Sequence, residues 1–290
     1  MEAAAANRLT GLRAAAATLI ATIVALALCA CSTTTGNLRD YSKQPLPSSV
    51  AEIRVLAYNI RLAAGVDAYA TDVYRLPWGR NLSGVIAAIR SVDADVIALQ
   101  EVAGSSQAEK IASALNMNFT YVGHQTGSSR PSWWGVAVLS KFPIRESRGA
   151  PISYGAGDSK SIVVATLELS GRPLTAVSIH KDKNLYDGSS VRNILAAVAD
   201  VQGPVVLAGD FNIQPGDARL DLMLPRFVDS ATAVDTPGAR YARARGTGFG
   251  RIDYVFPDVA HFAVIDAGLM QEPHDRASDH IGYWASLSLR

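Results

Sequence analysis

Polar side chains recur where apolar, strand-like segments of this sequence end, and their types are those that bind metal ions and move protons. Asn59 follows one such segment, Glu101 follows a second, and Asp210 follows a third. The other members of the set are Asn212, His180, Asp253, Asp279 and His280. Any one of them alone is better explained as a turn former, a helix cap or a structural histidine. Their repeated placement at segment ends indicates a shared site.

The chemistry of this set favours a hard divalent cation. Carboxylate and amide oxygens are the ligands preferred by Mg²⁺, Mn²⁺ and Ca²⁺. Both cysteines, Cys29 and Cys31, lie near the N-terminus, and no His-x-x-x-His pair is present. A closed zinc site is therefore not expected.

The segments that carry these residues are expected to form two sheets. Helical spacing of apolar residues is found in three stretches, 82–89, 108–115 and 191–201. Strand-like stretches are 53–58, 96–99, 119–122, 135–139, 161–169, 173–179, 205–208, 252–256, 262–267 and 281–289. Some strands are wholly apolar and others alternate, which predicts a layered α/β sandwich of two packed mixed sheets flanked by helices. In such folds ligands gather at strand ends.

Six short stretches stand in a recognisable order along the chain. They are Leu56–Arg61, Asp95–Val102, Gly135–Ile144, Val205–Asn212, Arg251–Phe256 and Ala277–His280. In their order and in their residues they resemble the endonuclease/exonuclease/phosphatase superfamily, and in particular its pancreatic-type deoxyribonuclease branch. Gly-Asp-Phe-Asn with a downstream Ser-Asp-His is the most specific pair among them. The resemblance implies metal-dependent hydrolysis of a phosphodiester or phosphomonoester.

The resemblance also implies which residues hold the metal. Glu101 would be the principal ligand, with Asn59 beside it, and Asp253 would support the metal or the histidines. The ion would be Mg²⁺, with Mn²⁺ or Ca²⁺ as alternatives.

Five further residues take catalytic roles by the same resemblance. Asp210 would orient or deprotonate the attacking water, and Asn212 would hold the nucleophile or a phosphate oxygen. Asp279 would hydrogen-bond a histidine, either His280 or His180, and fix its tautomer. His180 would be the second histidine that faces the phosphate. We expect all of these groups to lie together.

One expected partner is missing from the sequence. The pancreatic-type nucleases place an acidic partner for the first histidine on a mid-chain strand, but the stretch Ser129–Trp134 contains no carboxylate. Asp182, close to His180, is either a substitute for this partner or a solvated turn residue.

The N-terminus resembles the leader of a bacterial lipoprotein. Residues 1–30 combine a basic start and an apolar run, and Leu28–Cys31 resembles a lipobox. We therefore predict cleavage, lipidation of Cys31, a flexible tether over 31–50 and one domain over 51–290; the alternative is an uncleaved anchor helix. The mature domain would then contain no disulfide.

Charge limits the class of partner. Removal of the leader lowers Lys and Arg from 27 to 25 and Asp and Glu from 26 to 25, which leaves a net charge of zero. Proteins that hold long nucleic acids usually carry a basic excess, so nucleic acid is possible but not favoured. The sequence predicts an exported, membrane-anchored enzyme facing the periplasm or the cell exterior, whose substrate is nucleic acid, a phospholipid head group or a small phosphate ester. The alternative is a non-catalytic binding lipoprotein on the same fold. The oligomeric state does not follow from the sequence.

Overall fold

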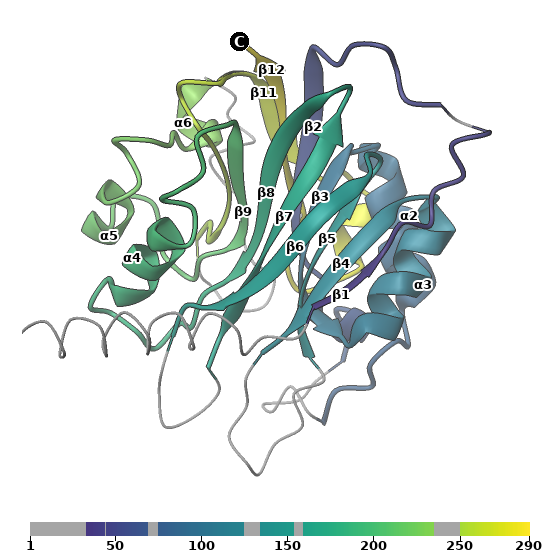
Figure 1. Ribbon diagram of the computed structural model, residues 1–290. Coiled ribbons are helices and arrows are strands. Elements are labelled where there is room, and N and C mark those ends of the chain that lie inside the picture. Colours follow the sequence, from purple (N-terminus) through teal and green to yellow (C-terminus); the bar gives the residue numbers. More distant parts are fainter. Residues whose placement is uncertain (1–32, 44, 69–74, 125–133, 154–158, 235–249) are drawn as a thin grey trace, which may run out of the picture.

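Two β-sheets form the centre of the molecule in a computed structural model of the chain (Figure 1). The structure describes residues 33–43, 45–68, 75–124, 134–153, 159–234 and 250–290. In this part, the larger sheet has the order β1-β4-β5-β3-β2-β12-β11 and the smaller sheet the order β10-β9-β8-β7-β6. The larger sheet consists of β1 (Thr33–Gly36), β2 (Glu52–Asn59), β3 (Val96–Ala103), β4 (Asn118–Gly123), β5 (Trp134–Ser140), β11 (Phe262–Leu269) and β12 (Tyr283–Leu289). The smaller sheet consists of β6 (Ile144–Pro151), β7 (Ser161–Leu169), β8 (Arg172–His180), β9 (Val205–Asp210) and β10 (Asp253–Pro257).

Each sheet contains one parallel pair near its middle. β2 runs parallel to β3 in the larger sheet, and β8 runs parallel to β9 in the smaller one. The carboxyl ends of these four strands all lie at the same end of the sandwich, which the site residues occupy.

The two sheets pack through alternate side chains of their strands. On β2, Ile53, Val55 and Ala57 join the apolar core between the sheets, whereas Leu56 and Tyr58 point to the opposite face. β8 and β9 show the same alternation on the other side of the core. Strands that are buried on both faces read as continuous apolar runs, which explains why the sequence shows little alternation there.

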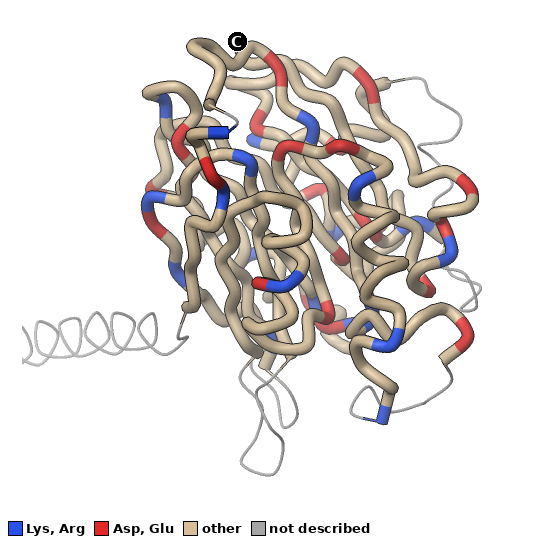
Figure 2. Tube along the Cα trace, turned by 90° about the vertical axis from the view of Figure 1, so that its right-hand side faces the viewer, with Lys and Arg blue, Asp and Glu red and all other residues tan. Residues whose placement is uncertain are grey.

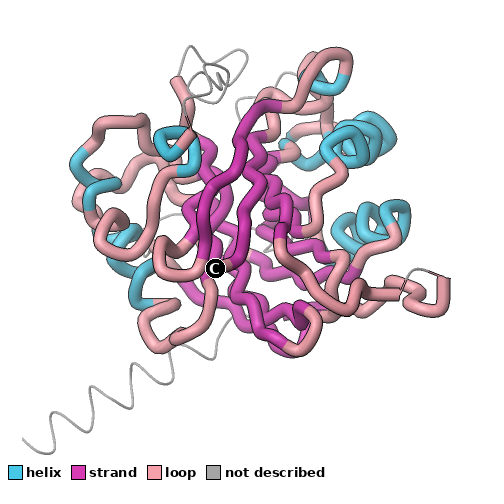
Figure 3. Tube along the Cα trace, turned by 90° about the horizontal axis from the view of Figure 1, so that it is seen from above, coloured by secondary structure: helices cyan, strands magenta, loops and turns pink. Residues whose placement is uncertain are grey.

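Helices cover the outer faces of both sheets (Figure 3). α2 (Leu82–Val92) and α3 (Ser105–Leu115) cover the larger sheet, and their apolar sides meet β2 and β3. α4 (Ser189–Ala196) covers the smaller sheet with the short helix α5 (Ala218–Asp221) nearby, whereas α6 (Ser230–Ala233) contacts β10 and β11 and adds Ala231 to the core between the sheets. The predicted layered α/β sandwich is therefore confirmed.

Element boundaries differ from the predictions in places. The third predicted helix, 191–201, begins at Ser189 and ends at Ala196. β6 was not predicted, because its outward residues are charged and it lies at a sheet edge. β3 continues to Ala103, four residues past the predicted end, and this extension contains Glu101.

The predicted tether over 31–50 is wrong for its first part. Residues Thr33–Gly36 form β1, which pairs with β4 at the edge of the larger sheet. Thr35 donates a hydrogen bond to the hydroxyl of Thr120 at 3.0 Å, and Asn37 bonds the backbone of Ile144. This stretch resembles a linker because it lacks an apolar period, yet β-branched threonines suit an edge strand. The leader itself lies outside the described residues.

The charges of the described chain are mixed. Figure 2, seen from the side of α2 and α3, shows basic and acidic residues interspersed. Within the described ranges, the structure contains no helix long and apolar enough to cross a membrane.

Candidate active site

Three predicted site residues form a row across the smaller sheet. His180, the last residue of β8, is paired in register with Asp210, the last residue of β9. Asp210 is also paired with Asp253, the first residue of β10. Directly opposed residues on neighbouring strands have Cβ atoms about 5 Å apart, so the register alone brings these side chains together. All three are buried.

Glu101 reaches the site through a bulge in β3. The pairing of β3 with β5 shifts register between Leu99 and Val102, and Glu101 has a left-handed φ of 51°. A bulge re-aims a side chain and often occurs beside an active site. Burial, followed by the nearby Asp279 carboxylate, raises the pKa of Glu101.

Hydrogen bonds join the two sheets at this end. The amide nitrogen of Asn59, at the end of β2, donates to Oδ2 of Asp210 at 3.2 Å. One residue before Glu101, Gln100 donates to the hydroxyl of Ser178 at 3.0 Å, and this hydroxyl donates to the carbonyl of Leu99 at 2.9 Å. The positions of Asn59 and Asp210 are therefore fixed by contacts between the sheets.

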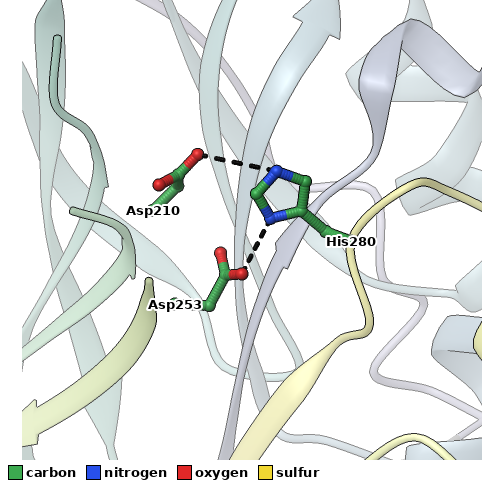
Figure 4. Close-up of side chains that lie close together, drawn as sticks. All are labelled: Asp210, Asp253 and His280. Atoms are coloured by element: carbon green, nitrogen blue, oxygen red, sulfur yellow. Dashed lines mark hydrogen bonds and ion pairs between the residues drawn. The ribbon is translucent and has the colours of Figure 1, made fainter. Parts of the chain in front are cut away.

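His280 is held by Asp253. Nδ1 of His280 lies 2.7 Å from Oδ2 of Asp253, and Figure 4 shows the ring between this carboxylate and that of Asp210. Burial alone would lower the pKa of His280, but the charge and hydrogen bond of Asp253 outweigh it and hold the pKa well above its ordinary value. His280 is therefore an imidazolium at neutral pH.

The predicted bond between Asp279 and a histidine is wrong. Oδ2 of Asp279 instead lies 3.3 Å from Nε of Arg61, which the 3₁₀ helix η1 (Arg61–Ala63) places beside the end of β2. Asp279 and His280 are sequence neighbours, so their side chains diverge. The loop is fastened by Ser278, whose hydroxyl donates to the carbonyl of Asn59 at 2.8 Å. Asp279 still lies close enough to affect the pKa values of Glu101 and His280.

Asp210 lies between the two histidines. Its Oδ2 is 3.8 Å from Nε2 of His180 and 3.8 Å from Nε2 of His280. Burial raises the pKa of Asp210 to about 7, although the His280 charge opposes this shift. A carboxylate with such a pKa can accept a proton from water near neutral pH.

Among the described residues, no acidic side chain bonds Nδ1 of His180. Nδ1 of His180 is buried and makes no hydrogen bond within the described residues. Its ring lies 5.6 Å from the ring of His124 and 5.5 Å from that of Trp134. Asp182 is a turn residue, since its carboxylate accepts from the backbone of Asn184 at 2.8 Å. Burial, then the charge of Lys160, lowers the pKa of His180 well below its usual value, so this ring is neutral.

Sequence reasoning missed two members of the cluster. Lys160 is buried, and its ammonium lies 3.7 Å from the centre of the Trp134 ring. Its charge lowers the pKa values of Glu101, His124 and His180. His124 directly follows β4, so the rule that found the other strand-end residues could have found it. Lys160 stands before β7 among turn residues and gave no such signal.

Asn212 lies beside the cluster, and its side chain bonds the backbone of a neighbouring strand end. Its amide donates to the carbonyl of Lys181 at 2.9 Å, and its backbone N–H donates to Asp210 at 2.9 Å. These two bonds hold the turn after β9, where Asn212 has a left-handed φ of 50°.

Two groups of side chains offer ligand atoms for a divalent cation, the first only where His280 is neutral, because an imidazolium cannot bind a metal. One ligand atom each from Asp210, Asp253 and His280 lie within 4.8 Å of one another. Asp253 also keeps a buried oxygen, Oδ1, that no described residue bonds. The second group is Glu101 with Asn59, where a buried carboxylate crowded by Asp279 would be stabilised by a positive ion. Asp253 thus holds His280 through Oδ2 and keeps Oδ1 for a cation.

Comparisons with known proteins agree with this geometry. A sequence model of the Endonuclease/Exonuclease/phosphatase family matches residues 56–280. Comparison with curated proteins gives no match. Among solved structures, an endonuclease/exonuclease/phosphatase from Beutenbergia cavernae is 24% identical, with a TM-score of 0.63 over 83% of this chain and 72% of that one.

Two other structures share the fold at lower identity. The human Nocturnin catalytic domain, solved with a bound sulfate anion, is 17% identical, with a TM-score of 0.63 over 90% of this chain and 97% of that one. The TDP2 of D. rerio, solved with a single-strand DNA product, is 16% identical, with a TM-score of 0.59 over 82% and 100%. Since the family match spans nearly all of the two-sheet domain, from β2 to His280, the chain belongs to the Endonuclease/Exonuclease/phosphatase family.

Proposed function

We propose that the protein hydrolyses a phosphate ester with the help of a divalent cation at the cell envelope. The observation that carries the proposal is the arrangement around Asp210. A buried carboxylate with a raised pKa lies between a neutral histidine, His180, and a cationic one, His280. Hydrolysis of a phosphate ester needs both a proton acceptor for water and positive charge near the phosphate.

Asp210 is the candidate base. Its pKa of about 7 leaves a substantial ionised fraction at neutral pH and still gives it affinity for a proton. Asn59 donates to one carboxylate oxygen and the backbone of Asn212 to the other, so the carboxylate cannot rotate freely. A fixed carboxylate of this kind suits a base that must take a proton from an attacking water.

His280 is the candidate cation and acid. Asp253 orients the ring through Nδ1, which leaves Nε2–H facing Asp210 and the reacting group. An imidazolium in this position stabilises charge that develops on phosphate oxygens, and it can give a proton to the leaving oxygen.

Glu101, with Asn59 beside it, would hold the cation. A bound Mg²⁺ would neutralise the non-bridging oxygens of the ester and polarise the phosphorus. Lys160 supplies further positive charge next to Glu101 and His180. A tetrahedral anion, sulfate, was bound in the Nocturnin structure, which supports phosphate as the group recognised by this fold.

The test is an assay of ester hydrolysis by the protein expressed from its full sequence and processed by the host. With Mg²⁺ present, we expect hydrolysis of bis(p-nitrophenyl) phosphate or p-nitrophenyl phosphate that Asp210→Asn reduces on the order of a hundredfold or more. Asp258→Asn is the matched control, because Asp258 is equally buried but lies past the far end of β10 and bonds Arg226. A folded chain that binds Mg²⁺ and hydrolyses neither ester would favour the binding lipoprotein instead.

A further inference from the structure

The chain enters the larger sheet at the end where the candidate site lies. Thr33, the first described residue, is paired with Val122 in β4. His124 lies two residues after Val122, directly past the end of β4, and its ring is 5.6 Å from that of His180. The C-terminus lies at the opposite end, because β12 starts near His280 and runs away from it (Figure 1).

Thr33 is also close to the site in the direction across the strands of the sheet. β1 is separated from β3, which carries Glu101, by β4 and β5. With strands about 5 Å apart, Thr33 lies on the order of 15 Å across the sheet from the strand of Glu101. Only Ser32 stands between Thr33 and Cys31, the predicted lipidated residue, so an anchor on Cys31 lies at most about 7 Å from the fold.

This short connection restricts how an anchored domain can turn. A free tether over 31–50 would let the domain adopt any orientation on a membrane. Because β1 is fixed to β4, an acyl chain on Cys31 holds the site end of the sandwich next to the lipid surface.

Two exposed aromatic side chains lie on segments at the same end. Trp78 is 56% exposed, in a turn whose Gly79 donates to the carbonyl of Leu62 in η1, directly after β2. Tyr186 is 73% exposed, six residues after His180, and its ring lies 5.4 Å from the Arg219 guanidinium. Trp and Tyr are enriched where proteins meet the head groups of a bilayer.

Exposed cations lie near both aromatic residues, although the exposed Asp187 directly follows Tyr186. Arg75 and Arg80 stand on either side of Trp78, and Lys183 precedes Tyr186 by three residues. Basic residues at such a position are attracted by anionic lipid head groups. Aromatic rings and cations together are the surface chemistry of a protein that lies on an anionic bilayer.

We propose that this end of the sandwich, with Trp78, Tyr186, Arg75, Arg80 and Lys183 at its rim, is a membrane-contact surface for an anionic phospholipid bilayer. The proposal rests on the lipidation of Cys31 and extends the proposed function, because it brings lipid head-group phosphates to the candidate site. A domain anchored elsewhere on its surface would leave the site facing the water.

The test uses Trp78, one of four tryptophans in the chain, as a depth reporter, and its contribution is read from the difference between the parent and Trp78→Phe. The full chain is made in a bacterial host with its leader, and it is reconstituted into vesicles of phosphatidylcholine and phosphatidylglycerol. Part of the phosphatidylcholine carries bromine on the acyl chains near the head group, which quenches tryptophan at the membrane surface. Mass spectrometry of the N-terminal peptide reports the state of Cys31.

Two variants place the reporter at opposite ends. We expect brominated lipid to quench the parent protein, and we expect Trp78→Phe to lose most of this quenching. In the Trp78→Phe background, Val259→Trp puts a new tryptophan in the exposed turn after β10, at the far end, where we expect it to add fluorescence that the brominated lipid does not quench. Circular dichroism of each variant checks the fold, and both positions are exposed enough to tolerate the change.

Three results would overturn the proposal. They are unchanged quenching in Trp78→Phe, strong quenching of the Val259→Trp reporter, and a processed chain whose Cys31 carries no lipid. None of these measurements needs turnover. A chain that hydrolyses a soluble ester but shows no Trp78 quenching refutes the contact surface alone, whereas quenching without hydrolysis of any ester refutes the proposed function alone.

Discussion

Replacement of Asp253 by Asn tests the pairing that the structure gives His280. The substitution keeps the shape of the side chain but removes the charge that lies 2.7 Å from Nδ1 of His280. A hydrogen bond to a charged group is worth about 1.5–3 kcal/mol. Its loss from the charged ring should therefore lower the pKa of His280. Burial, which already opposes the charged ring, then dominates.

The sign of the pH effect follows from this shift. In the parent protein, His280 keeps its proton through neutral pH, and activity should fall only as the pH rises through its raised pKa. In Asp253→Asn, the same fall should begin at lower pH, and the rate at neutral pH should drop by at most about 10–100-fold, the factor that about 1.5–3 kcal/mol corresponds to. The raised pKa also adds stability below the unfolded pKa of about 6.5, and this stability is lost as the pH rises through the folded pKa.

The assay combines a pH–rate profile with an NMR titration of the His280 ring. Asp258→Asn is the control, since Asp258 is a buried carboxylate with its own histidine neighbour, His261, at 3.4 Å and far from the site. It should lower the melting temperature without moving the pH profile. If Asp253→Asn leaves both the profile and the titration of His280 in place, the pairing does not control the histidine.

Three further predictions concern the cation, the buried lysine and the anchor. EDTA should abolish hydrolysis and Mg²⁺ or Mn²⁺ should restore it, while Glu101→Gln should weaken Mg²⁺ binding measured by titration calorimetry; full activity in EDTA would refute the metal requirement. Lys160→Met keeps the packing on Trp134 but removes a charge near Glu101 and His180, so kcat/KM should fall on the order of a hundredfold while the circular dichroism stays the same; a parent-like kcat/KM would exclude a role for this charge. Cys31→Ser should abolish incorporation of labelled fatty acid, and labelling that persists would show that another residue is acylated.

Much of the fold followed from apolar periodicity. The strands that are buried on both faces, such as β2 and β9, were found at nearly their observed lengths because little else reads as a short apolar run between turns. The edge strands β1 and β6 were not found, since an edge strand exposes polar residues and resembles a linker. Edge pairing depends on a neighbour that is distant in sequence, as Thr33 is from Val122.

The residues of the candidate site could be predicted from their positions at strand ends, but the contacts between their side chains could not. Strand-end position and the family resemblance pointed to Asn59, Glu101, His180, Asp210 and His280, which the structure brings together. The partner of His280 could not be read from adjacency, because Asp253 is 27 residues away and reaches it only through the pairing of β10 with β9. The same holds for Lys160, which becomes part of the site only when β7 packs beside β8.

The register that creates the site depends on close contact between the sheets. A Cβ on Gly209 would lie 2.1 Å from the carbonyl oxygen of Ile179 and 2.9 Å from the amide nitrogen of Gln100, and both distances are shorter than real Cβ contacts. The absent side chain leaves room for Gln100 to bond Ser178 directly behind Asp210. The position of the candidate base is therefore set by rigid strands and not by loops. Because loops can vary while such a centre stays fixed, one arrangement of strand ends can serve endonucleases, exonucleases and phosphatases alike.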